Sequence, residues 1–280
     1  MLDRDLLARA SGRREPNPNL EAFAVALDRE GARAGLDKPH RLASYLAQWG
    51  HESMGFVHDR ELWGPTAAQR RYEGRRDLGN TQPGDGYRFR GRTAAQLTGR
   101  ANYRSFTAWA RGRDLAAPDF EAEPDAILTD PWEGLVPLWY WDTGNPTRAS
   151  LNRYADDGNH EMVTRRINGG LNGYSDRLRR YTVAGLALLG RATDDVRGFQ
   201  GAAGLAVDGL AGPATRAALH AALRGLPDLL APTPAKPEAP GWDAIATPAP
   251  AAPTPDDPAA LIAEAQALLN RAVAALNTGA

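Results

Sequence analysis

Apolar residues recur every three to four positions in several segments between residues 20 and 190, a spacing that places them on one side of an α-helix. The clearest stripe follows Pro39 and consists of Leu42, Tyr45, Leu46 and Trp49. Helical patterns cover residues 20–35, 93–112, 131–141, 147–155, 158–167 and 175–190. Residues 55–92 are instead rich in Gly, Pro, Asn and Asp, which predicts long loops with at most short strands. The chain must therefore bury helix against helix, and we predict a mainly α fold.

The chain has 280 residues, enough for one large domain and a small one, and its 42% hydrophobic and 24% charged residues are those of an ordinary globular protein. A net charge of −1 predicts no general attraction to nucleic acid. Cysteine is absent, which excludes disulfides and thiolate chemistry. Charges interrupt the first residues, and no run of 18 apolar residues occurs. We therefore expect neither a signal peptide nor membrane insertion.

Changes in composition divide the chain into four parts. Residues 1–192 form a helix-rich domain, and residues 193–229 read as a small module of helix, glycine-rich turn and helix. Proline and alanine dominate residues 230–257, which predicts an extended linker. Residues 258–280 form an amphipathic helix, whose apolar face we expect to pack on the protein itself or, by self-association, on a second copy.

Glu52 is a candidate general acid. Trp49 and Tyr45 precede it by three and seven residues, so on a continuing helix the three share the apolar face. A carboxyl group on that face is poorly hydrated, and desolvation raises its pKa, as a general acid needs. The alternative is a glutamate at a frayed helix end that faces water, and the pattern leaves both open.

Glu61 follows nine residues later, beyond Gly55. A helix end and a loop can hold two carboxylates on opposite walls of a groove, and inverting glycosidases need such a pair roughly 6.5–9.5 Å apart. We expect no metal, because His51-Glu52 is followed by His58 and does not match the His-Glu-x-x-His pattern of zinc proteases.

Aromatic residues are frequent in the first domain, and most, such as Trp139-Tyr140-Trp141, are expected in the core. Trp63 and Tyr87 lie in loop segments instead. We predict that these two stack on sugar rings.

Three blocks resemble glycoside hydrolase family 19, the family of chitinases and related phage endolysins. They are His51-Glu52-Ser53-Met54-Gly55-Phe56, then Gly84 to Arg92 running into Gln96-Leu97-Thr98-Gly99-Arg100-Ala101-Asn102-Tyr103, and Ile167-Asn168-Gly169-Gly170-Leu171 with Asp176-Arg177. They occur in the family's order and span about residues 5–190. Two departures are Thr93-Ala94-Ala95, in place of a glycine and two bulky apolar residues, and Asn172, where many plant members have glutamate.

The resemblance implies a two-lobed, lysozyme-like or chitinase-like helical domain with a cleft, which inverts the anomeric centre without a cofactor. It implies that Glu52 is the general acid and Glu61 the general base. A hydroxyl at Thr98 would help to hold the attacking water. Sugar contacts fall on Gln96, Asn102 and Asn168, and an arginine that organises the acid falls on Arg177.

The 193–229 module resembles the second half of a peptidoglycan-binding domain. The matching residues are Phe199-Gln200, Gly204-Leu205, Val207-Asp208-Gly209, Gly212-Pro213 and Thr215. The first helix of such a domain is not evident, and the alternative is a helical hairpin that caps the catalytic domain.

The two resemblances together predict an endolysin-type muramidase that cleaves β-1,4 links in peptidoglycan glycan strands. We expect it to be made in the bacterial cytoplasm and to act on the cell wall after release, lysing the host cell. The alternatives are a chitinase acting on N-acetylglucosamine polymers and a non-catalytic wall-binding or phage structural protein.

Overall fold

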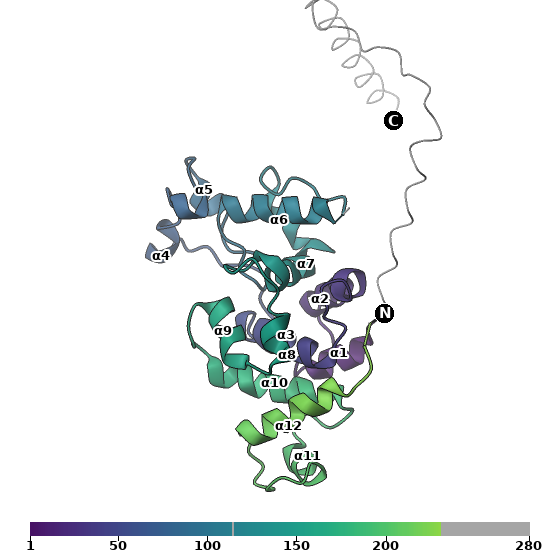
Figure 1. Ribbon diagram of the computed structural model, residues 1–280. Helices are drawn as coiled ribbons and strands as arrows, with labels where there is room; N and C mark the ends of the chain where they lie inside the picture. Colours follow the sequence, from purple (N-terminus) through teal and green to yellow (C-terminus); the bar gives the residue numbers. More distant parts are fainter. Residues whose placement is uncertain (114, 231–280) are drawn as a thin grey trace, which may run out of the picture. The chain divides into compact units, whose positions relative to one another are not determined.

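Helices make up nearly all the regular structure of the computed structural model, which describes residues 1–113 and 115–230 (Figure 1). In chain order they are α1 Arg4–Ala10, α2 Pro18–Ala26, the π-helix η1 Leu27–Gly31, α3 Pro39–Glu52, α4 Ala67–Arg70, the 3-10 helix η2 Arg76–Leu78, α5 Asp85–Arg88, α6 Arg100–Gly112, the 3-10 helix η3 Pro124–Leu128, α7 Trp132–Trp139, the π-helix η4 Tyr140–Gly144, α8 Asn152–Asp156, α9 His160–Asn168, α10 Tyr174–Leu188, α11 Val196–Ala202 and α12 Pro213–Arg224. Within these residues, β pairing is limited to isolated bridges of Arg92 with Arg60 and Leu97. The mainly α prediction is confirmed.

Two hydrophobic cores divide the helices into two lobes. The α3 lobe is built on α1, α3 and α8 to α12, with Tyr45, Trp49 and Tyr181 among its buried residues. The α6 lobe has a separate core, in which Phe89 and Tyr103 are buried with Phe106 and Phe120. In Figure 1, α4, α5 and α6 gather at one end, while α3, α9, α10 and α12 lie at the other.

Helix α7 contributes to both cores. Leu138 belongs to the core of the α3 lobe, whereas Leu135 and Trp139 belong to that of the α6 lobe. Helix α2 packs against α7 so closely that a Cβ on Gly134 would lie 2.0 Å from the carbonyl oxygen of Ala22. The two lobes are therefore joined through a shared helix rather than through a loop alone.

Several predicted bounds were wrong because the backbone departs from the helical region where the side-chain pattern does not. The segment predicted at 93–112 becomes helical only at Arg100, since Thr93 and Gln96 have positive φ angles of 62° and 50° and Gly99 has 91°. The helix predicted at 147–155 begins at Asn152, after Arg148 at φ 52°. The pattern at 20–35 combines α2 and η1.

The region 55–92 holds short helices rather than short strands, and α1 was not predicted at all. Asp3 caps α1 by accepting from the backbone N–H groups of Asp5 and Leu6. Thr66 and Gln69 form a capping box at the start of α4. Such local polar contacts hold these short helices where an apolar stripe is too short to be recognised.

Helices α11 and α12 pack on the α3 lobe through Phe199, Leu219 and Leu223. Within the described residues, no helix is both long enough and apolar enough to cross a membrane. The predicted 258–280 helix, with its self-association, and the 230–257 linker beyond Leu230 lie outside the described residues.

Candidate active site

Glu52 is the last residue of α3, at a sharp change of chain direction. The predicted stripe on this helix is buried, and Glu52 itself keeps 24% of its side chain exposed. The next residues Met54, Gly55 and Phe56 all have positive φ angles, of 52°, 78° and 63°. Ser53 holds this turn by donating to the carbonyl of Trp49 and accepting from the N–H of Phe56. The carboxyl group therefore has a fixed place at the end of an apolar helix.

Arg177 on α10 holds the Glu52 carboxylate. Its Nη2 donates to Oε1 of Glu52 at 2.5 Å, and its Nη1 donates to Oε1 of Gln48 at 2.6 Å. Gln48, one turn before Glu52, donates in turn to the hydroxyl of Thr164. Arg177 is 1% exposed, so the pair is shielded from water on the arginine side. Among the described residues, Oε2 of Glu52 has no hydrogen-bond partner and remains available to a ligand.

A second polar contact connects α3 and α10 next to the Glu52–Arg177 pair, because His51 precedes Glu52 and Asp176 precedes Arg177. Nδ1 of His51 lies 2.8 Å from Oδ2 of Asp176. Partial burial opposes ionisation of Asp176, but hydrogen bonds from His51, Arg180 and Arg179 hold its pKa well below the usual range. The imidazole packs on Gly173, where a Cβ would lie 2.1 Å from the ring.

Glu61 lies on the other lobe, in the extended segment that pairs with residues 91 and 92. Its N–H donates to the carbonyl of Gly91 at 2.9 Å, and its Oε2 accepts from the N–H of Gly91 at 3.3 Å. Its Oε1 accepts from the side-chain amide of Gln69 at 3.0 Å. Burial and the nearby Glu61 carboxylate raise the pKa of Tyr72.

Trp63 and Tyr87 meet in an aromatic group next to Glu61. The ring centroid of Trp63 lies 5.3 Å from that of Tyr87 and 6.2 Å from that of Tyr72. Tyr87 is 52% exposed, and the guanidinium of Arg90 lies 4.5 Å from its ring centroid. The structure thus brings the two predicted stacking residues together, with Tyr72 as a third member that the sequence did not indicate.

Gln96, Thr98 and Asn102 form a connected group on the same lobe. A Cβ on Gly91 would lie 2.4 Å from Oε1 of Gln96 and 3.4 Å from Oε2 of Glu61, so both side chains lie against this glycine. Thr98 donates its hydroxyl to the carbonyl of Gln96, and Asn102 donates to the carbonyl of Thr98.

Asn168 lies apart from this group, exposed at the end of α9 on the α3 lobe. The carbonyl of its neighbour Ile167 accepts from Tyr140, whose pKa is raised by burial and by the Glu52 carboxylate. Asn168 therefore lies on the same lobe as Glu52, and not on the lobe of Glu61.

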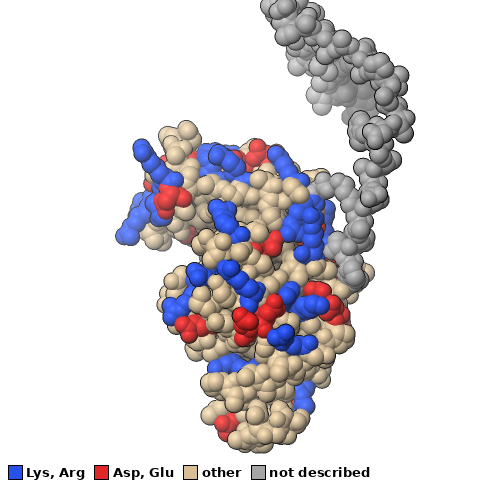
Figure 2. All heavy atoms as spheres, in the orientation of Figure 1, with Lys and Arg blue, Asp and Glu red and all other residues tan. Residues whose placement is uncertain are grey.

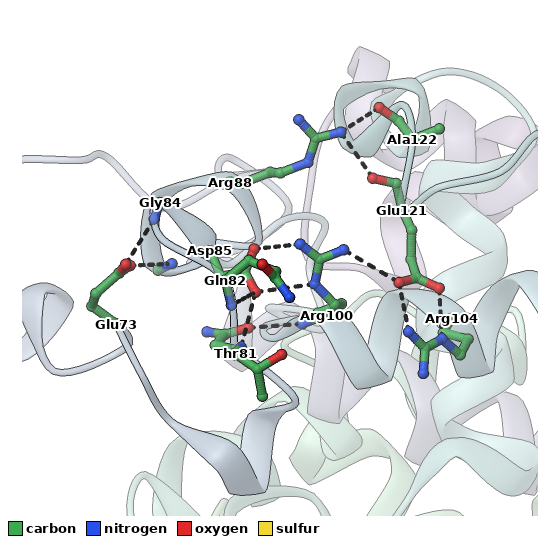
Figure 3. A network of polar contacts seen from close by, with 12 residues as sticks. Glu73, Thr81, Gln82, Gly84, Asp85, Arg88, Arg100, Arg104, Glu121 and Ala122 are labelled. Atoms are coloured by element: carbon green, nitrogen blue, oxygen red, sulfur yellow. Dashed lines mark hydrogen bonds and ion pairs between the residues drawn. The ribbon is translucent and has the colours of Figure 1, made fainter.

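A salt-bridge network fixes the segment that carries Tyr87 (Figure 3). Asp85 is 1% exposed and accepts from Arg100 and from the backbone N–H groups of Thr81 and Gln82. Glu121 pairs with Arg104 and, at 3.5 Å, with Arg100. Glu73 accepts from the N–H groups of Gly84 and Gly86. It thereby connects the segment after α4 to the start of α5. These contacts hold the loops of the α6 lobe that the glycine-rich sequence alone would leave free.

The described part of the chain holds no group of three His, Cys, Asp or Glu side chains that could bind a metal. Sequence reasoning missed Gln48, Gln69 and Tyr140 as neighbours of the two carboxylates. Gln48 had a signal, since a residue four positions before Glu52 shares its helix face. The Thr66-x-x-Gln69 pattern signals a capping box, but it does not reveal the contact with Glu61.

No protein-family model matches the chain. A protein of Haemophilus influenzae, described as a glycosyl hydrolase family 19 domain-containing protein, is 32% identical over 183 residues, which cover 56% of this chain and 84% of that protein. An endochitinase of Arabidopsis thaliana is 30% identical over 151 residues, which cover 54% of this chain and 47% of the plant protein.

Two solved structures share the fold. Chitinase C from Streptomyces griseus superposes with a TM-score of 0.52 and 20% identity, over 69% of this chain and 78% of that one. A bacterial family 19 chitinase superposes with a TM-score of 0.50 and 22% identity, over 66% and 94%. At these identities the likeness concerns the arrangement of helices.

Proposed function

The chain belongs to glycosyl hydrolase family 19, and from that premise we propose that it is an inverting, endolysin-type muramidase that cleaves β-1,4 links in peptidoglycan glycan strands. The observation that carries the proposal is the pair of carboxyl groups on different lobes, Glu52 and Glu61, each held by donors from the protein.

In this mechanism Glu52 protonates the leaving glycosidic oxygen, and Glu61 activates a water molecule on the opposite face of the sugar. Arg177 keeps Oε1 of Glu52 in place, so that Oε2 faces the substrate. Thr98 and Gln96 lie on the side of Glu61, where they help to hold the water and the sugar. Trp63 and Tyr87 offer apolar rings on which a pyranose can stack.

Charge supports peptidoglycan as the substrate. Residues 60–92 contain eight arginines and four acidic residues. Several of these arginines are exposed near α4 and η2 on the α6 lobe, among them Arg70, Arg71 and Arg76. Blue side chains of Lys and Arg stand out on this part of Figure 2. Peptide stems on peptidoglycan carry carboxylates, whereas chitin is uncharged, so this surface favours the anionic polymer.

The α11–α12 hairpin is the second support. Its turn is held by Gln200, which is 1% exposed, donates to Asp208 and Thr215, and accepts from the N–H of Gly209. Val207 and Leu210 project from this turn and are 50% and 68% exposed. We propose that the hairpin, within residues 193–229, contacts the cell wall, and that the enzyme acts there after release from the cytoplasm and lyses the host cell.

A chitinase is the second candidate, favoured by the names of the Arabidopsis and Streptomyces proteins. One experiment separates the candidates: loss of turbidity of purified bacterial cell walls and release of products from soluble N-acetylglucosamine oligomers, measured in parallel for the parent and Glu52→Gln. Clearing of walls that depends on Glu52, with little action on the oligomers, supports the muramidase. The opposite pattern makes the protein a chitinase, and inactivity on both substrates leaves a wall-binding or structural protein.

A further inference from the structure

Gln69 is buried between α4 and the Glu61 segment, with a side chain 4% exposed. Its Oε1 accepts from the backbone N–H groups of Gly64 at 3.0 Å and Thr66 at 2.7 Å. Its Nε2 donates to Oε1 of Glu61 at 3.0 Å and to the carbonyl of Leu62 at 2.8 Å. All four hydrogen-bonding positions of the amide group are therefore used.

These partners allow one orientation of the amide. Turning it over would put the NH₂ group against the two backbone N–H donors, Gly64 and Thr66, and the amide oxygen against the Glu61 carboxylate. Four favourable contacts would become four repulsive ones in a buried place. An N–H of Gln69 consequently always points at Oε1 of Glu61, while the N–H of Gly91 approaches Oε2.

Hydrogen bonds from fixed donors hold a carboxylate in one orientation. We propose that Gln69 is a positioning residue that holds Oε1 of Glu61 in place and so keeps the Glu61 carboxylate aimed at the attacking water. The inference rests on the proposed function, in which Glu61 is the base.

The test is Gln69→Glu, measured on whichever glycan the parent cleaves. The new carboxylate still accepts from Gly64 and Thr66, but it replaces a donor to Glu61 with a like charge, which disfavours the ionised base. We expect kcat at neutral pH to fall at least about tenfold with KM within about twofold. We also expect the acidic limb of the pH profile of kcat/KM to move up by about one pH unit or more.

The matched control is Thr66→Ala. It removes the hydroxyl that accepts from the N–H of Gln69 at 3.2 Å, and so weakens the α4 cap without changing the contact with Glu61. We expect its acidic limb to coincide with that of the parent. An unmoved limb in Gln69→Glu, or an equal shift in Thr66→Ala, overturns the inference.

Two further variants keep the result decisive. If Gln69→Glu does not fold, Gln69→Met removes the donor at similar volume, and a fall in kcat below about twofold overturns the inference. Glu61→Gln tests the base itself: full activity there refutes the proposed function. Loss of activity there, combined with an unmoved limb in Gln69→Glu, refutes only the role of Gln69.

Discussion

Replacing Glu52 with glutamine separates chemistry from structure, because the change alters one atom and leaves the volume of the side chain. Hydrogen bonds to charged groups contribute about 1.5–3 kcal/mol, and the amide oxygen of the variant can still accept from Arg177. Arg177 also keeps its bond to Gln48. We therefore expect a loss of about 1–2 kcal/mol in the free energy of unfolding, equivalent to a fall in Tm of about 3–6 °C.

Catalysis should respond far more strongly than stability. General acid catalysis contributes about 10²–10⁴-fold, and an amide cannot protonate the leaving oxygen. We expect less than about 1% of the parent's hydrolytic rate, assayed by cell-wall turbidity and by reducing ends released from the preferred glycan.

Glu30→Gln is the matched control. Glu30 is 5% exposed and pairs with Arg113 at 2.9 Å, so it is another shielded carboxylate and arginine pair, but it lies away from the site. We expect a comparable loss of stability with full activity. A folded Glu52→Gln protein that retained more than a few per cent of the parent's rate would remove Glu52 from the role of acid.

Four other outcomes are expected. NMR of fresh product from a β-linked substrate should show the α-anomer first, and prompt β-anomer would contradict the inverting assignment. Gly173→Ala should lower both Tm and activity, because the new methyl group would clash with the ring of His51 and because residue 173 has a positive φ of 68°. An unchanged Tm and rate would contradict this. Asp85→Asn should lower the free energy of unfolding by about 3 kcal/mol at pH 7, measured by urea unfolding. Burial opposes ionisation, but Arg100 and backbone donors lower the pKa of Asp85. The stability that the Asp85 carboxylate contributes is therefore present above pH 4 and lost as the pH falls. An equal loss of stability in Asp85→Asn at pH 3 would argue against the Asp85–Arg100 pair. Burial, reinforced by Asp59 and Asp130, raises the pKa of Glu133 to about 7. The stability that the protonated Glu133 contributes is therefore present below pH 4.5 and lost as the pH rises through 7. The Tm of Glu133→Gln minus that of the parent should be larger at pH 8 than at pH 5, and a constant difference would refute this.

The sequence predicted the helices that bury a long apolar stripe and failed where single backbone angles decide. Leu42, Tyr45 and Trp49 identify α3 because its period is that of a helix. Thr93 and Gln96 adopt positive φ angles in a stretch whose side chains still follow a helical pattern, and that pattern carries no information on φ.

The sequence proposed the residues of the candidate site, and the structure adds most of the contacts among them. Glu52 and Arg177 lie in family blocks 125 positions apart; the resemblance implied that the arginine organises the acid, and the packing of α3 on α10 gives the contact its geometry. The partnership of Gln69 with Glu61 combines a local cap with a contact across eight positions. A four-residue pattern predicts the cap, but no pattern predicts which carboxylate lies behind it.

The two carboxyl groups differ in the sequence distance to the residues that donate hydrogen bonds to them. Glu61 is held by residues 8 and 30 positions away, whereas Glu52 is held by an arginine 125 positions away. Contacts between distant residues need long loops to close and form late in folding. The half of the site that carries Glu61 can thus assemble while α10 is still being synthesised, and the half that carries Glu52 cannot. With Glu52 as the proposed acid, we therefore expect a nascent chain to have no activity on glycans until α10 has been made.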